Sequence, residues 1–260
     1  MPWGTVTGIQ RGKYQDEGRS IVLVHSLAQG AELWSPFAEH LARDYHVVAL
    51  DVRGHGASSW DGNDFSIEDL ADDSAQALQE IGVKRAAVLG MSMGGCVAMA
   101  IATRHPQLVD RLILADTTAD YGPGKQQAWA QRAATAVGKP RPQQLSFQLE
   151  RWFSPEFIEA DPAEVERVSA VFVATDSTAH AAACRALGQF EHTAELAKIV
   201  CPTLILVGED DQATPVPMAL GLHAGIAGST LSVLARTRHM SLVENRQSWQ
   251  QVRDFLRGDQ

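Results

Sequence analysis

The 260-residue sequence predicts an α/β fold, with a mostly parallel central sheet, helices on both faces and an inserted helical cap. Two observations carry this prediction. Short runs rich in Val, Leu, Ile and Ala recur in both end portions of the chain, as expected of parallel strands buried on both faces. Between Asp116 and about Glu195 such runs vanish, and helical patterns punctuated by Gly and Pro replace them.

The N-terminal part contains two predicted strands. Residues 21–24 form the first, which leads into the loop 25–30 with the sequence HSLAQG. Residues 47–50 form the next, which is closed by the turn 51–56 with the sequence DVRGHG, whose glycines permit positive φ. In this arrangement both loops lie at the carboxyl ends of strands, where ligands bind in open α/β sheets.

The five residues 90–94, GMSMG, are the most informative feature of the chain. They follow an apolar run at 85–89 and precede a helical pattern at 95–102, and strand, sharp turn and helix are the context of a nucleophile elbow. Glycines two residues before and after the serine avoid collisions in that turn. The pattern therefore predicts Ser92 as a nucleophile that attacks a carbonyl carbon.

A serine hydroxyl needs a histidine base and a carboxylate that orients the base, and both are present downstream. The strand 203–207 leads into a loop that holds Asp211, our candidate acid. Asp210 is a rival, and so is Asp116, which ends the predicted strand 111–115. After a short strand at 230–234 comes His239, our candidate base, and then a helix that begins near Glu244. The chain order serine, aspartate, histidine is that of one class of triad enzymes.

The remaining parts of the predicted site come from the backbone. The Leu27 N–H in the loop 25–30 and the Met93 N–H after the nucleophile are the expected oxyanion donors. Most other histidines lie in stretches without a catalytic signal and are expected to be surface or structural residues. They are His40, His46, His105, His180, His192 and His223.

The predicted cap spans residues 119–195, inserted into a core formed by 1–118 and 196–260, and the whole is expected to be one structural domain. The cap should supply the substrate pocket. Its aromatic residues are candidates for lining that pocket or for the cap's own core: Trp129, Trp152, Phe153, Phe172 and Phe190. Arg132, Arg151 and Arg185 are the candidates for holding a substrate carboxylate.

Composition excludes several classes of function. The net charge is −9 and no run of Lys or Arg occurs, so nucleic acid or an anionic membrane is an improbable partner. No signal peptide or spanning segment is evident, and the three cysteines, Cys96, Cys184 and Cys201, suit reduced thiols, so we expect a cytoplasmic protein. Neither metal-ligand spacing nor a dinucleotide motif occurs, so we expect no metal and no cofactor.

Together these motifs resemble the α/β-hydrolase superfamily, over nearly the whole chain. Within it the sequence is most similar to the 3-oxoadipate enol-lactonase group, through the segments 33–34, 129–132, 151–157, 181–184 and 239–244. The resemblance implies hydrolysis of a small lactone or ester, with an anionic substrate as one option. Ser26 and Trp34 are then further candidates for contacting the substrate, and a monomer or small homo-oligomer is expected.

The sequence departs from the group at three places. His180 replaces the usual tyrosine, the segment from Gly188 to Glu191 replaces an Arg-x-x-Asp pattern, and Arg238 replaces a small residue. Family membership is therefore firmer than substrate identity. A general carboxylesterase, a perhydrolase or a carbon–carbon hydrolase would use the same triad. Outside hydrolysis, a lyase, a cofactor-free dioxygenase or a binding protein could share the fold.

Overall fold

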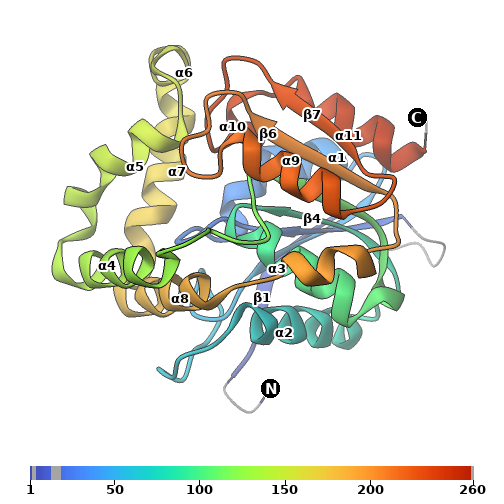
Figure 1. Ribbon diagram of the computed structural model, residues 1–260, viewed down its shortest axis with the longest axis horizontal. Coiled ribbons are helices and arrows are strands. Elements are labelled where there is room, and N and C mark those ends of the chain that lie inside the picture. Colours follow the sequence, from blue (N-terminus) through green and yellow to red (C-terminus); the bar gives the residue numbers. More distant parts are fainter. Residues whose placement is uncertain (2–3, 13–18, 259–260) are drawn as a thin grey trace.

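A computed structural model describes residues 1, 4–12 and 19–258. Within these residues seven strands form one sheet in the order β1-β3-β2-β4-β5-β6-β7 (Figure 1). All neighbouring pairs are parallel except β1 with β3. The strands are β1 (Thr7–Arg11), β2 (Ser20–Val24), β3 (His46–Asp51), β4 (Ala86–Met91), β5 (Val109–Ala115), β6 (Thr203–Gly208) and β7 (Thr230–Leu234).

Helices cover both faces of this sheet because the strands are apolar on both sides. Alternate residues of β2 show the division: Val22 and Val24 belong to one buried cluster, Ile21 and Leu23 to the other. The first cluster includes residues of α2 (Ile67–Glu80), α3 (Met93–Arg104) and α9 (Val216–Gly225). The second includes residues of α1 (Ser35–Leu41), α10 (Ser241–Glu244) and α11 (Ser248–Arg257).

The strand β1 was not predicted from the sequence. Its residues are all exposed or half-buried, so the run lacks the continuous apolar pattern that marks the central strands. It pairs with β3 at the edge of the sheet, from Thr7 opposite Asp51 to Arg11 opposite Val47. An antiparallel edge strand needs no second buried face, and this explains why composition alone missed it.

Five α-helices lie between β5 and β6 in the chain and gather beyond one end of the sheet (Figure 1). We refer to this segment as the cap, and α4 packs against α8 within it. Its helices are α4 (Lys125–Gly138), α5 (Leu145–Trp152), α6 (Pro155–Ala160), α7 (Pro162–Ala174) and α8 (Ser177–Gln189). Short 3₁₀ helices occur at Ala31–Trp34, Pro106–Leu108, Arg141–Gln144 and Thr193–Lys198.

The two ends of the cap are tied together at its base. Asp120 and Glu191 form an isolated antiparallel bridge. The Lys125 ammonium contacts the Asp120 carboxylate and donates to the Phe190 carbonyl at 2.7 Å. The cap is therefore anchored where it leaves and rejoins the sheet. No helix in the described part of the chain has the length and apolar character needed to cross a membrane.

Candidate active site

Ser92 lies in the sharp turn between β4 and α3, with φ +57° and ψ −120°. A non-glycine residue adopts such a conformation only where its surroundings enforce it. Two glycines make the turn possible: a Cβ on Gly90 would lie 2.0 Å from the Gly94 carbonyl oxygen, and one on Gly94 would lie 2.1 Å from the Val24 carbonyl oxygen. The glycine spacing in the sequence thus reflects close backbone approach on both sides of the serine.

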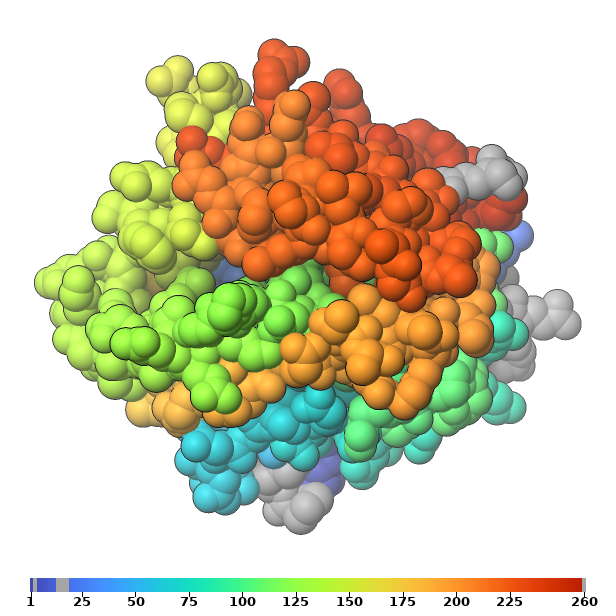
Figure 2. All heavy atoms as spheres, in the orientation of Figure 1, coloured from blue at the N-terminus to red at the C-terminus, as the bar shows by residue number. Residues whose placement is uncertain are grey.

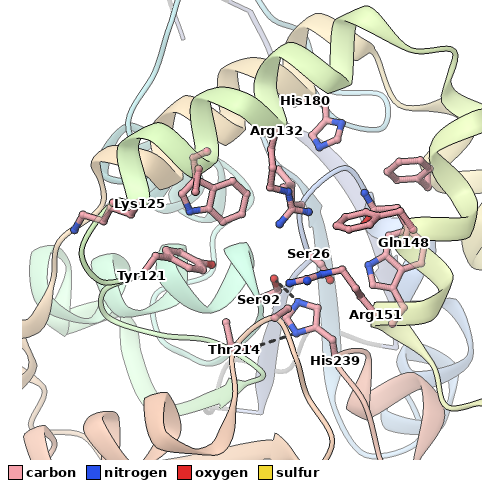
Figure 3. Close-up of a pocket in the computed structure, with 18 of the residues that line it drawn as sticks. Ser26, Ser92, Tyr121, Lys125, Arg132, Gln148, Arg151, His180, Thr214 and His239 are labelled. Atoms are coloured by element: carbon pink, nitrogen blue, oxygen red, sulfur yellow. Dashed lines mark hydrogen bonds between the residues drawn. The ribbon is translucent and has the colours of Figure 1, made fainter.

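The turn presents the Ser92 hydroxyl to His239, which comes from the loop after β7 (Figure 3). Ser92 Oγ lies 2.9 Å from His239 Nε2, and His239 Nδ1 lies 2.8 Å from Asp211 Oδ2. All three side chains are buried. The structure therefore brings together the three residues that the sequence named as nucleophile, base and acid.

Asp211 is held by a dense set of donors in the loop after β6. Its carboxylate accepts from the Ala213 and Thr214 N–H groups at 2.7 and 3.0 Å, and from the Thr214 hydroxyl at 2.8 Å. Burial opposes ionisation of Asp211, but the His239 charge and these hydrogen bonds outweigh it and lower its pKa to about 2. Asp211 is thus a fixed anion at neutral pH, whereas its rival Asp210 is exposed.

His239 is poised as a base by the same pairing. Burial alone would lower its pKa, but the charge and hydrogen bond of Asp211, with a contribution from Asp116, raise that pKa above the usual value of 6.5. Because its Nδ1–H is directed to Asp211, its Nε2 can accept the Ser92 proton. The imidazole can therefore exchange a proton with the nucleophile near neutral pH.

Asp116, the second rival for the acid, does not contact His239 by a hydrogen bond in the described structure. It is fully buried with φ +48°, and its two oxygens accept from the Gly208 and Ser241 N–H groups at 3.0 and 2.9 Å. Gly208 ends β6 directly before the loop that carries Asp211, and Ser241 follows His239 by two residues. Asp116 thus joins the two loops of the triad, and burial followed by the Asp211 charge raises its pKa to about 7.

Of the two expected oxyanion donors, Met93 directly follows Ser92 in the chain and Leu27 shares its cavity. Met93 is the first residue of α3, so its N–H has no partner within the helix. Leu27 lines the same cavity as Ser92. His25 fixes this loop, because its Nε2 accepts from the Val52 N–H at 3.1 Å, which leaves Nδ1–H to donate to the Ser26 carbonyl at 2.7 Å.

A cavity of about 300 Å³ opens above Ser92, between the core loops and the cap. The surface is hollowed between the yellow-green cap and the orange segment of the core (Figure 2). Of the predicted contacts, Ser26, Trp129, Arg132, Arg151 and Trp152 line the cavity, as does Phe172. Sequence reasoning missed the remaining polar lining residues, which are Tyr121, Lys125, Gln148, His180 and Thr214.

Arg132 and Arg151 both line this cavity, and Figure 3 shows them near Ser92. Arg132 stacks on Trp129, 4.6 Å from the ring centre, and Arg151 donates weakly to the Gln212 carbonyl at 3.5 Å. Neither forms an ion pair with any described carboxylate. Burial lowers the pKa of Arg151, and the charge of Arg132 acts in the same direction. The two cations thus act on each other, and the charge of Asp211 opposes this effect on Arg151 without forming an ion pair.

Three expectations for the pocket need correction. Arg185 does not line the cavity, because it pairs with Asp64 at the surface at 2.5 Å. Trp34 is buried among core side chains, where its ring contacts Phe37, rather than facing the cavity. Phe153 and Phe190 lie in the apolar core and do not line the cavity, which is one of the two placements that the sequence allowed for them. By contrast His180, expected to be surface or structural, lines the cavity.

No group of His, Cys, Asp and Glu side chains in the described residues could hold a metal ion. Cys96 and Cys184 are buried and Cys201 is half-buried, and all three are free thiols. Burial raises the pKa of Cys96 and of Cys184 to about 11, so neither is a ready nucleophile. The reactive chemistry of the described site is therefore that of Ser92 and its neighbours.

Comparison with known proteins agrees with this geometry. The family model described as "alpha/beta hydrolase fold" matches residues 19–246. This chain belongs to the α/β-hydrolase family. It is 30% identical to 3-oxoadipate enol-lactonase 2 of Acinetobacter baylyi, over 90% of this chain and 87% of that protein. It is 28% identical to (E)-2-((N-methylformamido)methylene)succinate hydrolase of the same organism, over 87% and 85% of the two chains.

A solved structure is similar throughout its length. The enol-lactonase from Burkholderia xenovorans superposes on this hydrolase with a TM-score of 0.91 at 29% identity, covering 97% of this chain and 96% of the other. The likeness therefore includes the cap as well as the sheet, and the cap is the part that forms most of the cavity wall.

Proposed function

We propose that this protein is a serine hydrolase that opens a small carboxylate-bearing lactone or ester, such as an enol-lactone, through an acyl-enzyme on Ser92. The observation that carries the proposal is a hydrogen-bonded Ser92–His239–Asp211 array beneath a cavity with two arginines that form no ion pair with a described carboxylate. The array supports nucleophilic attack on a carbonyl carbon. The arginines support a substrate that carries negative charge.

The first step is attack by Ser92 Oγ on the substrate carbonyl as His239 Nε2 takes its proton. Asp211 stabilises the resulting imidazolium, and the Leu27 and Met93 N–H groups receive the oxyanion. His239 then gives the proton to the departing oxygen. Water activated by His239 next hydrolyses the ester on Ser92 and restores the free serine.

A lactone imposes an extra demand on this sequence of steps. Its departing oxygen stays tethered to the acyl group, so water must attack before the ring closes again. An enol avoids this competition because it tautomerises to a ketone, which is a poor nucleophile. This chemistry favours an enol-lactone over a simple lactone as the substrate of such a site.

Two relatives support an anionic substrate. The names of 3-oxoadipate enol-lactonase and of the methylenesuccinate hydrolase both contain a dicarboxylic parent acid. The cavity of about 300 Å³ is at the small end of ligand sites, which suits a compact acid rather than a long acyl chain. The net charge of −9 makes a local cation necessary for drawing such a substrate in.

The test is a panel of 3-oxoadipate enol-lactone, its methyl ester and 4-nitrophenyl esters of two to eight acyl carbons, assayed with the wild type and Ser92→Ala. We expect kcat/KM to be highest for the carboxylate-bearing lactone and activity on every substrate to disappear in Ser92→Ala. Ser169→Ala is a matched control, since that hydroxyl bonds only to a carbonyl within α7. Equal turnover by Ser92→Ala and the wild type would refute the proposal.

A general carboxylesterase is the second candidate, because the cavity wall also contains Trp129, Trp152 and Phe172, which offer apolar area to a neutral acyl group. The same panel separates the two functions. A preference for neutral 4-nitrophenyl esters over the carboxylate-bearing lactone would favour the esterase.

A further inference from the structure

Buried Arg141 fixes the protonation state of His180. His180 lines the cavity above Ser92, and the proposed function assigns it no role. Arg141 lies in the cap, where its guanidinium donates to the Phe172 carbonyl through Nε at 3.1 Å and Nη2 at 2.5 Å. The guanidinium also stacks on the Phe172 ring, 3.7 Å from its centre. Its remaining contact is from Nη1 to His180 Nδ1, at 2.5 Å.

This last contact determines the tautomer of His180. A guanidinium has only donors, so His180 Nδ1 must accept and cannot carry a proton. The ring proton of the neutral imidazole is therefore on Nε2. Burial, the Arg141 charge, and then His55 and Arg132 lower the pKa of His180 to about 2, so the ring stays neutral at physiological pH.

The donor that results is free to bind a ligand. No hydrogen bond to His180 Nε2 is formed within the described residues, although the side chain lines the cavity. In the view of Figure 3, Arg132 lies between His180 and Ser92, and the Arg132 charge acts on the imidazole. A neutral N–H donor thus accompanies a cation on the cap side of the cavity, away from the nucleophile.

We propose that His180 is a specificity-determining residue, whose Nε2–H donates to a substrate carboxylate oxygen that Arg132 binds from the other side. A carboxylate accepts at both oxygens, so one can face the guanidinium while the other faces the imidazole. A carboxylate held there lies remote from Ser92 and sets how far the scissile carbonyl stands from it. This inference rests on the proposed hydrolase function and names its recognition group.

Two substitutions of similar size, His180→Gln and His180→Glu, distinguish a role of His180 in binding the substrate carboxylate from a purely structural role. In His180→Gln, Oε1 can accept from Arg141 while Nε2 donates into the cavity, so both functions of the imidazole are retained. In His180→Glu, the side chain can still pair with Arg141, but its ionised form has no donor and repels an anion. A structural role alone would make the two variants alike or favour Glu, since only Glu neutralises the buried Arg141.

The measurement is KM for 3-oxoadipate enol-lactone relative to KM for its methyl ester, with calorimetric binding of adipate as a readout independent of turnover. We expect His180→Glu to raise the KM ratio and the adipate Kd at least tenfold, and His180→Gln to change them about threefold or less. His192→Gln is a control at a buried histidine outside the cavity, which contacts Thr103 at 3.1 Å. Thermal melts confirm that each variant is folded.

The outcomes are distinguishable. If the wild type hydrolyses both lactones but Glu and Gln change the ratio and the adipate Kd equally, the role of His180 is refuted while the hydrolase stands. If the wild type hydrolyses no lactone or ester of the panel and does not bind adipate, the proposed function and the inference both fail.

Discussion

The loops at the carboxyl ends of β4–β7 and the cavity wall formed by the cap differ in whether their charged groups have partners within the protein. On the loop side, Asp211 accepts hydrogen bonds from three residues and Asp116 accepts from two backbone N–H groups. On the cap side, Arg132 and Arg151 form no ion pair with a described carboxylate, and His180 Nε2 forms no hydrogen bond within the described residues. The groups to which we assign proton transfer are thus fixed in advance, whereas in our proposal the groups of the cap gain their partner from a bound ligand.

This difference has an energetic basis. Preorganised partners lower the barrier because they need no rearrangement as charge develops during the reaction. Partly buried cations without an ion-pair partner raise the free energy of the ligand-free protein. A bound anion would remove this penalty, so such cations are suited to binding an anionic substrate. The predictions that follow test one side against the other.

The largest expected effect is on the loop side. Asp211→Asn keeps the shape of the side chain but removes the charge that orients and stabilises the His239 imidazolium, so kcat should fall about 10⁴-fold. Steady-state kinetics on the best substrate of the panel provides the measurement. Asp210→Asn, at the exposed neighbouring carboxylate, should stay near the wild type. Similar losses in both variants would mean that the paired carboxylate has no special role.

The cap side predicts a smaller effect, confined to charged substrates. Arg132→Met or Arg151→Met should raise KM for the carboxylate-bearing lactone about 10- to 100-fold, since a hydrogen bond to a charged group contributes about 1.5–3 kcal/mol. The methyl ester should respond much less. Arg185→Met serves as the control, because Arg185 pairs with Asp64 outside the cavity. An equal rise in KM for neutral and anionic substrates would contradict the prediction that the cap arginines bind the substrate carboxylate.

The pH profile of the wild type sharpens the role of His239. Protonated imidazole cannot accept the Ser92 proton, so kcat/KM should fall about tenfold per pH unit below the pKa of His239. Because the Asp211 charge and hydrogen bond raise that pKa above its usual 6.5, the decline should begin above pH 6.5, and Asp211→Asn should move it to lower pH. A rate that is flat from about pH 5 to 7 would contradict the assignment of the base.

The smallest expected effect concerns stability rather than turnover. Asp116→Asn places an amide where a carboxylate now accepts two N–H groups, so one of these hydrogen bonds must be lost. We expect the free energy of unfolding to fall by about 1–3 kcal/mol, measured by urea denaturation. Asp110→Asn, which affects an exposed pair with Arg85, should change it by about 0.5 kcal/mol or less. The reverse order of effects would show that Asp116 does not brace the loops.

The difference between the loops after the strands and the cap also explains which site residues the sequence could predict and which it could not. Ser92 and Asp211 each follow a buried strand within a short motif, so local pattern and chain order were sufficient to choose them. The wall of the cavity depends instead on which face each cap helix turns inward. Arg185 and Cys184 are neighbours on α8, yet the first is exposed and the second is buried.

His180 shows the limit most clearly. The role that we propose for it depends on Arg141, which lies 39 residues away in the chain and on another element of the cap, so no local motif indicates the pair. The substitution of His for the usual tyrosine was visible in the sequence, but its meaning required the contact. Trp34 was misassigned for a related reason, since an aromatic residue beside the oxyanion loop can face the cavity or the core.

The most direct test of the central claim is mass spectrometry of the protein after incubation with a small serine-directed organophosphonate. The account predicts a single adduct on the peptide that contains Ser92, loss of esterase activity in step with labelling, and slower labelling when adipate occupies the cavity. A folded protein that takes no label on Ser92, or that stays active when fully labelled there, would contradict it.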